Sequence, residues 1–174
     1  MDPLGTLIAT DQRRTLEFFF LGLRDLCDAT VDHQELLYNA SILAHYAQVS
    51  TGASEDLPTP ADLGAVFDGF VVGATERQDG VLIEAAGAQC LLLAGFFEDQ
   101  MRRRYNIRWY AELGATFFRR AAHREPVAHK AWLLSRLSNR FEHWRQRHAQ
   151  LSRELRDQAY LLSLPGPPRS SRVA

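Results

Sequence analysis

The sequence predicts an all-α protein: a single-domain bundle of about six helices, with a central apolar helix and a long C-terminal helix. Apolar residues recur in steps of three and four along the chain, the period of helices that bury one face. No Asn-Gly or Asp-Gly turn separates two alternating segments, so no β-hairpin is expected. A chain of 174 residues, 46% hydrophobic and 24% charged, fits one globular core.

The predicted domain covers residues 10–163, between a flexible N-terminus at 1–9 and a disordered tail at 164–174. The N-terminus lacks a basic start followed by an apolar run, so no signal peptide is predicted. The longest nearly apolar stretch, 81–97, is interrupted by polar residues and is shorter than the ~20 residues that cross a bilayer. We therefore expect a cytoplasmic protein that does not enter the membrane.

The first two helices are predicted from their caps and their spacing. Thr10 or Asp11 can cap the first helix, which we expect to end near Asp28. Asp32 followed by Glu35 is typical of a capping box at the start of the second. Their buried faces carry apolar residues at helical spacing, among them Leu16, Phe19, Leu23, Leu36, Ala40 and Leu43.

The middle of the chain supplies the predicted central helix. A loop at 50–57 precedes Thr59 and Pro60, which are favourable residues for a helix start. The segment 81–94 is apolar nearly all round, which indicates a helix surrounded by other helices. Gly95 is expected to break it.

The second half of the chain predicts three more helical segments. Glu98 to Arg104 forms a short one, with acids at its start and arginines at its end. The next helix buries Tyr110 and Phe117, and a long helix, or two nearly collinear ones, follows Pro126 and ends before Pro165. The long helix has a mostly apolar seam formed by Leu134, Leu137, Phe141, Trp144, His148, Leu151, Leu155, Gln158 and Leu162.

The seam of the long helix could form a coiled coil. A parallel homodimer would set Arg140 against Arg145 of its partner, and this contact between like charges disfavours it. We expect the helix to pack on its own domain, and antiparallel dimerisation is the alternative.

The charges are segregated along the chain. Residues 1–100 carry 4 arginines against 16 carboxylates, a net charge of −12, and residues 101–174 carry 16 basic residues against 5 acidic ones, a net charge of +11. The leading hypothesis is a non-enzymatic interaction or regulatory protein whose oppositely charged halves pair within one molecule or between molecules. The predicted contact residues are Arg102, Arg103, Arg104, Arg140, Arg145 and Arg147.

Two other classes of function stay open. The first is a helical small-molecule binder or enzyme with an apolar pocket, which His45, Asn39 or Tyr38 would line. The second is nucleic-acid binding by the basic C-terminal helices, with Tyr105, Trp109 or Trp144 stacked on bases. The pI of about 6.6 and the lack of a recognition motif disfavour nucleic acid.

No catalytic, cofactor or metal signature is present in the sequence. The six histidines do not form the helical Glu-x-x-His pattern of carboxylate metal sites. Asp25, Asp28 and Asp32 straddle a predicted helix end, and no second acidic cluster accompanies them. Cys27 and Cys90 form no CxxC pair, so reduced thiols are expected. We therefore predict neither a cofactor nor a bound metal.

The chain contains a string of residues formed by Leu91, Leu93, Gly95, Phe96, Phe97, Arg102 to Arg104, Tyr110, Gly114, Arg120 and Ala121. This string resembles a pattern in small uncharacterised bacterial helical proteins, in which it joins two helices. The resemblance implies a bacterial all-α protein and no particular activity or ligand. Glu98 stands where those relatives often have proline.

Overall fold

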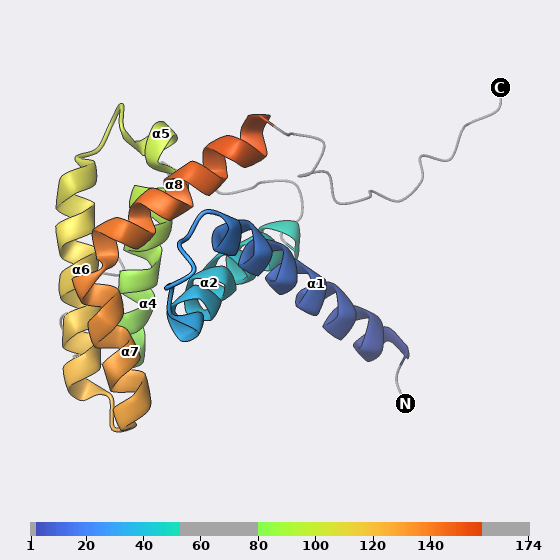
Figure 1. Cartoon of the computed structure of the whole chain (residues 1–174), viewed down its shortest axis with the longest axis horizontal. Coiled ribbons are helices and arrows are strands. Elements are labelled where there is room, and N and C mark those ends of the chain that lie inside the picture. The colour runs from blue at the N-terminus through green and yellow to red at the C-terminus, as the bar shows by residue number, and fades with distance from the viewer. Residues whose placement is uncertain (1–2, 53–79, 158–174) are drawn as a thin grey trace.

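The computed structural model describes residues 3–52 and 80–157, and every regular element in these ranges is helical, as predicted (Figure 1). There are seven α-helices and one π-helical turn in these ranges. The predicted helix after Pro60 and the predicted C-terminal tail lie outside the described residues. The elements are α1 (Pro3–Asp25), α2 (His33–Gly52), α4 (Gly80–Leu91), η1 (Leu92–Phe96), α5 (Glu98–Met101), α6 (Ile107–Arg124), α7 (Ala128–Asn139) and α8 (Phe141–Asp157).

The helices form two groups that α8 connects. α4, α6 and α7 lie side by side, whereas α1 packs on α2 (Figure 1). α8 packs on the π-helical turn η1 and also contacts α6 and α1. Every described element contributes to one cluster of buried apolar side chains. No helix of the described residues combines the length and the apolar character that a membrane span requires.

The predicted cap of α2 is confirmed, but only half of the capping box forms. Oδ1 of Asp32 accepts hydrogen bonds from the backbone N–H groups of Gln34 at 2.9 Å and Glu35 at 3.0 Å. The Glu35 side chain is fully buried and binds two arginines of the C-terminal helices. This position therefore serves tertiary structure as well as the helix start.

The predicted start of α1 is wrong. α1 begins at Pro3, not at Thr10 or Asp11, so most of the segment expected to be a flexible N-terminus is helical. Proline is favoured in the first turn of a helix because its ring fixes φ and its missing N–H would have no partner there. α1 ends at Asp25, three residues before the predicted end at Asp28.

The apolar helix predicted at 81–94 is present as α4, and η1 continues it. Ala86, Cys90 and Ala94 are completely buried. Gly95 does not break the helix but lies inside η1, where a Cβ atom would come within 2.8 Å of the His148 Cβ. Glycine is needed at this position because the α8 backbone approaches closely.

The long C-terminal helix is divided into α7 and α8 at Arg140, and α8 turns away from the direction of α7 (Figure 1). The two segments are not collinear, although the Arg140 N–H still bonds to the Arg136 carbonyl at 2.9 Å. The described part of the seam is buried within the chain itself, as expected for a helix that packs on its own domain. It consists of Leu134, Leu137, Phe141, Trp144, His148, Leu151 and Leu155.

Candidate functional site

The six predicted contact arginines have different environments. Arg140 binds buried Glu35, and the Arg145 side chain is only 11% exposed. Arg147 is half-buried and donates to Gln150 at 3.1 Å. Arg102, Arg103 and Arg104 are exposed in the turn between α5 and α6. The sequence prediction therefore grouped two kinds of arginine in one interface: some lie inside the fold, and others lie on its surface.

Glu35 joins α2 to the C-terminal helices. Its Oε1 accepts from Arg136 Nε at 3.3 Å, and its Oε2 accepts from Arg140 Nη1 at 3.0 Å. One turn further along α2, Asn39 donates to the Glu35 carbonyl at 2.8 Å and lies 2.9 Å from His148 Nε2. Burial lowers the pKa of His148 to about 3, so the ring is neutral at neutral pH. These buried polar contacts fix the position of α2 against α8.

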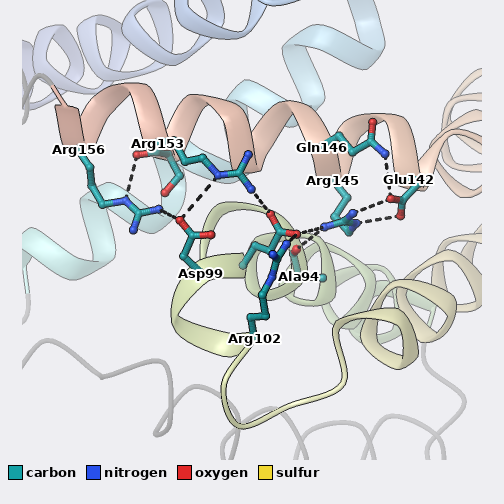
Figure 2. A network of polar contacts seen from close by, with 10 residues as sticks. Ala94, Asp99, Arg102, Glu142, Arg145, Gln146, Arg153 and Arg156 are labelled. Carbon is teal, nitrogen blue, oxygen red and sulfur yellow. Dashed lines mark hydrogen bonds and ion pairs between the residues drawn. The ribbon is translucent and has the colours of Figure 1, made fainter.

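Glu98 is the centre of a second ion-pair network, and its partners Arg102, Arg145 and Arg153 are labelled in Figure 2. Its side chain is 7% exposed and accepts from Arg102 at 2.6 Å, Arg145 at 3.0 Å and Arg153 at 2.6 Å. Arg153 and Arg156 reach neighbouring Asp99 from the same side of α8 (Figure 2). Three arginines of α8 thus hold α5 against that helix.

Arg145 also binds the π-helical turn. Its Nη1 donates to the Ala94 carbonyl at 3.2 Å, and its Nη2 donates to Glu142 at 2.6 Å (Figure 2). A π-turn leaves the regular hydrogen-bond pattern of the helix, and Arg145 supplies a donor at that point. Hydrogen bonding to Glu142 and Glu98 raises the pKa of Arg145 above its usual value despite burial.

The pKa of Glu98 reflects two opposing effects. Burial favours the neutral carboxyl group and raises the pKa, whereas hydrogen bonds and charge from Arg102 and Arg145 lower it. The net result is a pKa below the ordinary glutamate value. The pKa of Glu142 is also lowered, mainly by its hydrogen bond from Arg145. Both carboxylates are therefore ionised at neutral pH.

An open groove of about 790 Å³ lies beside this network, between the α5–α6 turn and the α7–α8 junction. Its charged groups pair with one another. Arg102 pairs with Glu98, as described above, and Arg108 pairs with Glu112 at 3.0 Å. Ile107, Ala111 and Phe141 give the groove an apolar part. The groove therefore presents apolar surface among charges that are already neutralised.

Exposed arginines and an exposed tryptophan stand next in sequence to residues that line the groove, Arg103 and Arg104 between Arg102 and Tyr105, and Trp109 after Arg108. The side chains of Arg103 and Arg104 form no ion pair or hydrogen bond with another described residue. Trp109 is 49% exposed, and its ring meets Tyr110 edge-on at 4.9 Å between centroids. Tyr105 lines the groove and contacts Tyr110 in the same way at 6.0 Å. Cationic and aromatic residues thus follow one another closely in the sequence of this turn.

The residues predicted to line an apolar pocket do not line this groove. Tyr38 donates from its hydroxyl to Glu84 at 2.8 Å, and burial together with Glu84 raises its pKa well above the usual value. Asn39 is completely buried in its contact with His148, and His45 is exposed. Tyr38 and Asn39 thus make polar contacts within the fold, and the apolar pocket that they would line stays a prediction.

The structure also limits the predicted nucleic-acid contacts. Trp144 is completely buried and cannot stack on a base, whereas Trp109 is exposed and Tyr105 is half-buried. Within residues 3–52 and 80–157, no three His, Cys, Asp or Glu side chains come together as a possible metal site. Cys27 and Cys90 are free thiols, and burial raises the pKa of each.

Comparisons with known proteins do not identify a relative: no family model matches the chain, and no curated protein or solved structure matches it significantly.

The sequence interpretation missed Glu35 as an ion-pair partner, because its place in a capping-box pattern already accounted for it. A second pattern marks the other side of this contact. Arg136 and Arg140 lie four residues apart, which places them on one side of the helical segment, beside the apolar seam. Two polar side chains at this spacing beside an apolar seam indicate a polar contact within the fold.

Proposed function

We propose that the protein is a non-enzymatic interaction protein that binds an acidic segment of a partner protein at the α5–α6 turn. The binding surface consists of Arg102, Arg103, Arg104, Trp109 and the adjoining groove. One observation carries the proposal: Arg103 and Arg104 are exposed without a described ion-pair partner, whereas Arg140 and Arg145 bind carboxylates within the chain.

The chemistry of this surface favours a protein partner with acidic and apolar residues. Guanidinium groups bind carboxylates through paired hydrogen bonds, and arginine and tryptophan are enriched among the residues that dominate binding energy at interfaces. The charges of the groove are already paired, so an apolar side chain entering it would contact Ile107 and Phe141 without breaking an ion pair. An acidic segment with one apolar anchor residue fits both parts.

Nucleic acid fits this surface less well. A protein segment can place an apolar residue in the groove, whereas a nucleic-acid strand following the groove would carry phosphate charge past Glu98, Glu112 and Glu142. The groove is also open, and an extended protein segment uses such a shape better than a small molecule, which proteins usually enclose.

Selection from a random peptide display library tests the proposal. The full-length protein serves as bait, and peptides that also bind the Arg103→Glu/Arg104→Glu variant are removed. We expect the remaining peptides to be enriched in aspartate and glutamate, with one apolar residue at a fixed position. A selected peptide should lose at least about tenfold in affinity for the variant, because two charge-assisted contacts are lost.

Arg119→Glu/Arg120→Glu is the matched control, since both residues are exposed on the outer face of α6 and the charge change is identical. Peptide binding should not change in this variant. An absence of acidic enrichment would contradict the proposal, as would an equal loss of binding in both variants. Binding of single- or double-stranded DNA or RNA that is tighter than peptide binding and falls steeply with salt would favour nucleic acid instead.

A further inference from the structure

The solvent face of α1 carries a short stripe with apolar residues at its centre and opposite charges at its ends. Arg14, Phe18, Leu21 and Asp25 are separated by steps of four, three and four residues, so they follow one side of the helix. All four side chains are exposed, with Phe18 at 38% and Leu21 at 37%. We call these four residues the α1 stripe.

The opposite side of α1 is the side that packs against the protein. Phe19 and Leu23 are buried there, and a Cβ atom at Gly22 would come within 3.0 Å of Leu151 in α8. Phe18 meets the buried Phe19 ring edge-on at 5.3 Å between centroids, and this contact supports the exposed ring. α1 therefore presents the stripe from a helix whose inner face is held in place.

Little of the described chain lies next to the outer face of α1. α1 packs mainly on α2 and more weakly on α8. In Figure 1 its N-terminal half extends beyond all other described helices. The stripe itself lies in the C-terminal half of α1, where its four exposed side chains are accessible to a partner helix.

We propose that two copies of this chain associate through antiparallel pairing of their α1 stripes. In this arrangement Phe18 of one copy packs on Leu21 of the other, and Arg14 of one copy pairs with Asp25 of the other. The two-fold symmetry repeats each contact, which gives two apolar contacts between two ion pairs. The order of the residues, basic, apolar, apolar and acidic, makes the stripe complementary to itself only when the helices are antiparallel.

Parallel pairing is disfavoured by the same residues. It would set Arg14 against Arg14 and Asp25 against Asp25, and contacts between like charges oppose association. The long C-terminal helix, the other candidate for dimerisation, has its seam buried in its own chain. Charge complementarity therefore favours a second copy of α1 as the occupant of the stripe.

The stripe is small compared with the ~1,200–2,000 Å² of a standard stable interface. We therefore expect a reversible dimer with a dissociation constant in the micromolar range, not a permanent one. Arg24 now pairs with Asp25 at 3.2 Å on the surface. Such exposed pairs are weak, so Asp25 can exchange this partner for Arg14 of a second copy at little cost.

Sedimentation velocity over about 1–500 µM full-length protein measures the dissociation constant. We expect Arg14→Asp, and separately Asp25→Arg, to raise it by at least about tenfold, because each change creates two contacts between like charges. The double variant restores opposite charges and should return the constant to within about threefold of the parent value. Arg13→Asp is the matched control, since it makes the same charge change at an exposed position beside the stripe.

Thermal unfolding of each variant shows whether the fold is retained. We expect little change in melting temperature, because the substituted positions are exposed on one helix face. A parent protein that stays monomeric up to about 500 µM would overturn the proposal. So would Arg13→Asp and Arg14→Asp acting equally, or a double variant that fails to recover. The Arg103→Glu/Arg104→Glu variant should dimerise normally, so this proposal and the proposed function can fail separately.

Discussion

The buried contact of Glu35 allows a quantitative test of the ion pairs that join the two halves of the chain. Glu35→Gln keeps the shape of the side chain but removes the charge that Arg136 and Arg140 bind. Removing one partner of a buried pair costs about 3–5 kcal/mol. The two arginine side chains are 38% and 31% exposed, so water replaces part of the lost contact, and we expect a loss of about 2–3 kcal/mol.

Urea unfolding measures this loss directly. For a chain of this size, about 2–3 kcal/mol lowers the melting temperature by about 5–10 °C, and it lowers the urea midpoint by about 1 M if the m-value is unchanged. Glu112→Gln is the matched control, because its ion pair with Arg108 is mostly exposed and should contribute less than about 0.5 kcal/mol. A Glu35→Gln variant as stable as the control would refute the structural role of this contact.

Three further predictions concern packing and pH. Gly114→Ala should destabilise the protein by about 2 kcal/mol in urea unfolding, because a Cβ atom would lie 2.6 Å from the Cys90 Cβ and would also overlap the Phe141 ring. Gly80→Ala meets only ordinary contacts and should not destabilise the protein, so equal effects of the two variants would contradict the packing described. Because the pKa of His148 is lowered in the folded protein, the unfolded state binds a proton more readily, and the stability that neutral His148 contributes is complete above about pH 6.5 and declines as the pH falls towards 3. His148→Gln should flatten this part of the profile of urea midpoint against pH, and an unchanged slope would contradict this role of His148. The pKa of Glu98 is also lowered, so the stability that ionised Glu98 contributes is complete above the unfolded pKa of about 4.5 and is lost as the pH falls through the folded pKa. Glu98→Gln should remove this loss of stability at acidic pH in the same measurement, and a variant that keeps the full loss would show that other carboxylates cause it.

Much of the fold follows from short-range patterns in the sequence. The period of the apolar residues located α2, α4, α6 and the buried seam of α7 and α8, because helical packing requires one apolar face. The cap at Asp32 was predictable since its oxygen satisfies N–H groups only two and three residues away. These features depend on neighbours that the sequence itself places close together.

Other features depend on neighbours that the sequence does not place. Gly95 was expected to end a helix, but its role depends on the approach of α8. The break at Arg140 has no proline or glycine to mark it, and Ser138 and Asn139 are only weak indications. Glu98 was assigned to the first turn of a short helix, and its contact with Arg153 joins positions far apart in the chain.

The charge segregation was visible in the sequence, but its use was not. Composition cannot distinguish an arginine that pairs within the chain from one that faces a partner. The structure separates Arg140 and Arg145, which bind Glu35 and Glu98, from Arg103 and Arg104 on the surface. The candidate site is therefore a subset of the predicted arginines, selected by burial.

The central claim is that the arginines of this chain have two roles, one structural and one available for binding. Urea unfolding of two charge-reversed proteins tests it most directly. Arg140→Glu/Arg145→Glu should lose several kcal/mol of stability, because each new carboxylate would approach Glu35 or Glu98, whereas Arg103→Glu/Arg104→Glu should stay within about 0.5 kcal/mol of the parent. Equal losses in the two proteins would contradict the division between structural and binding arginines.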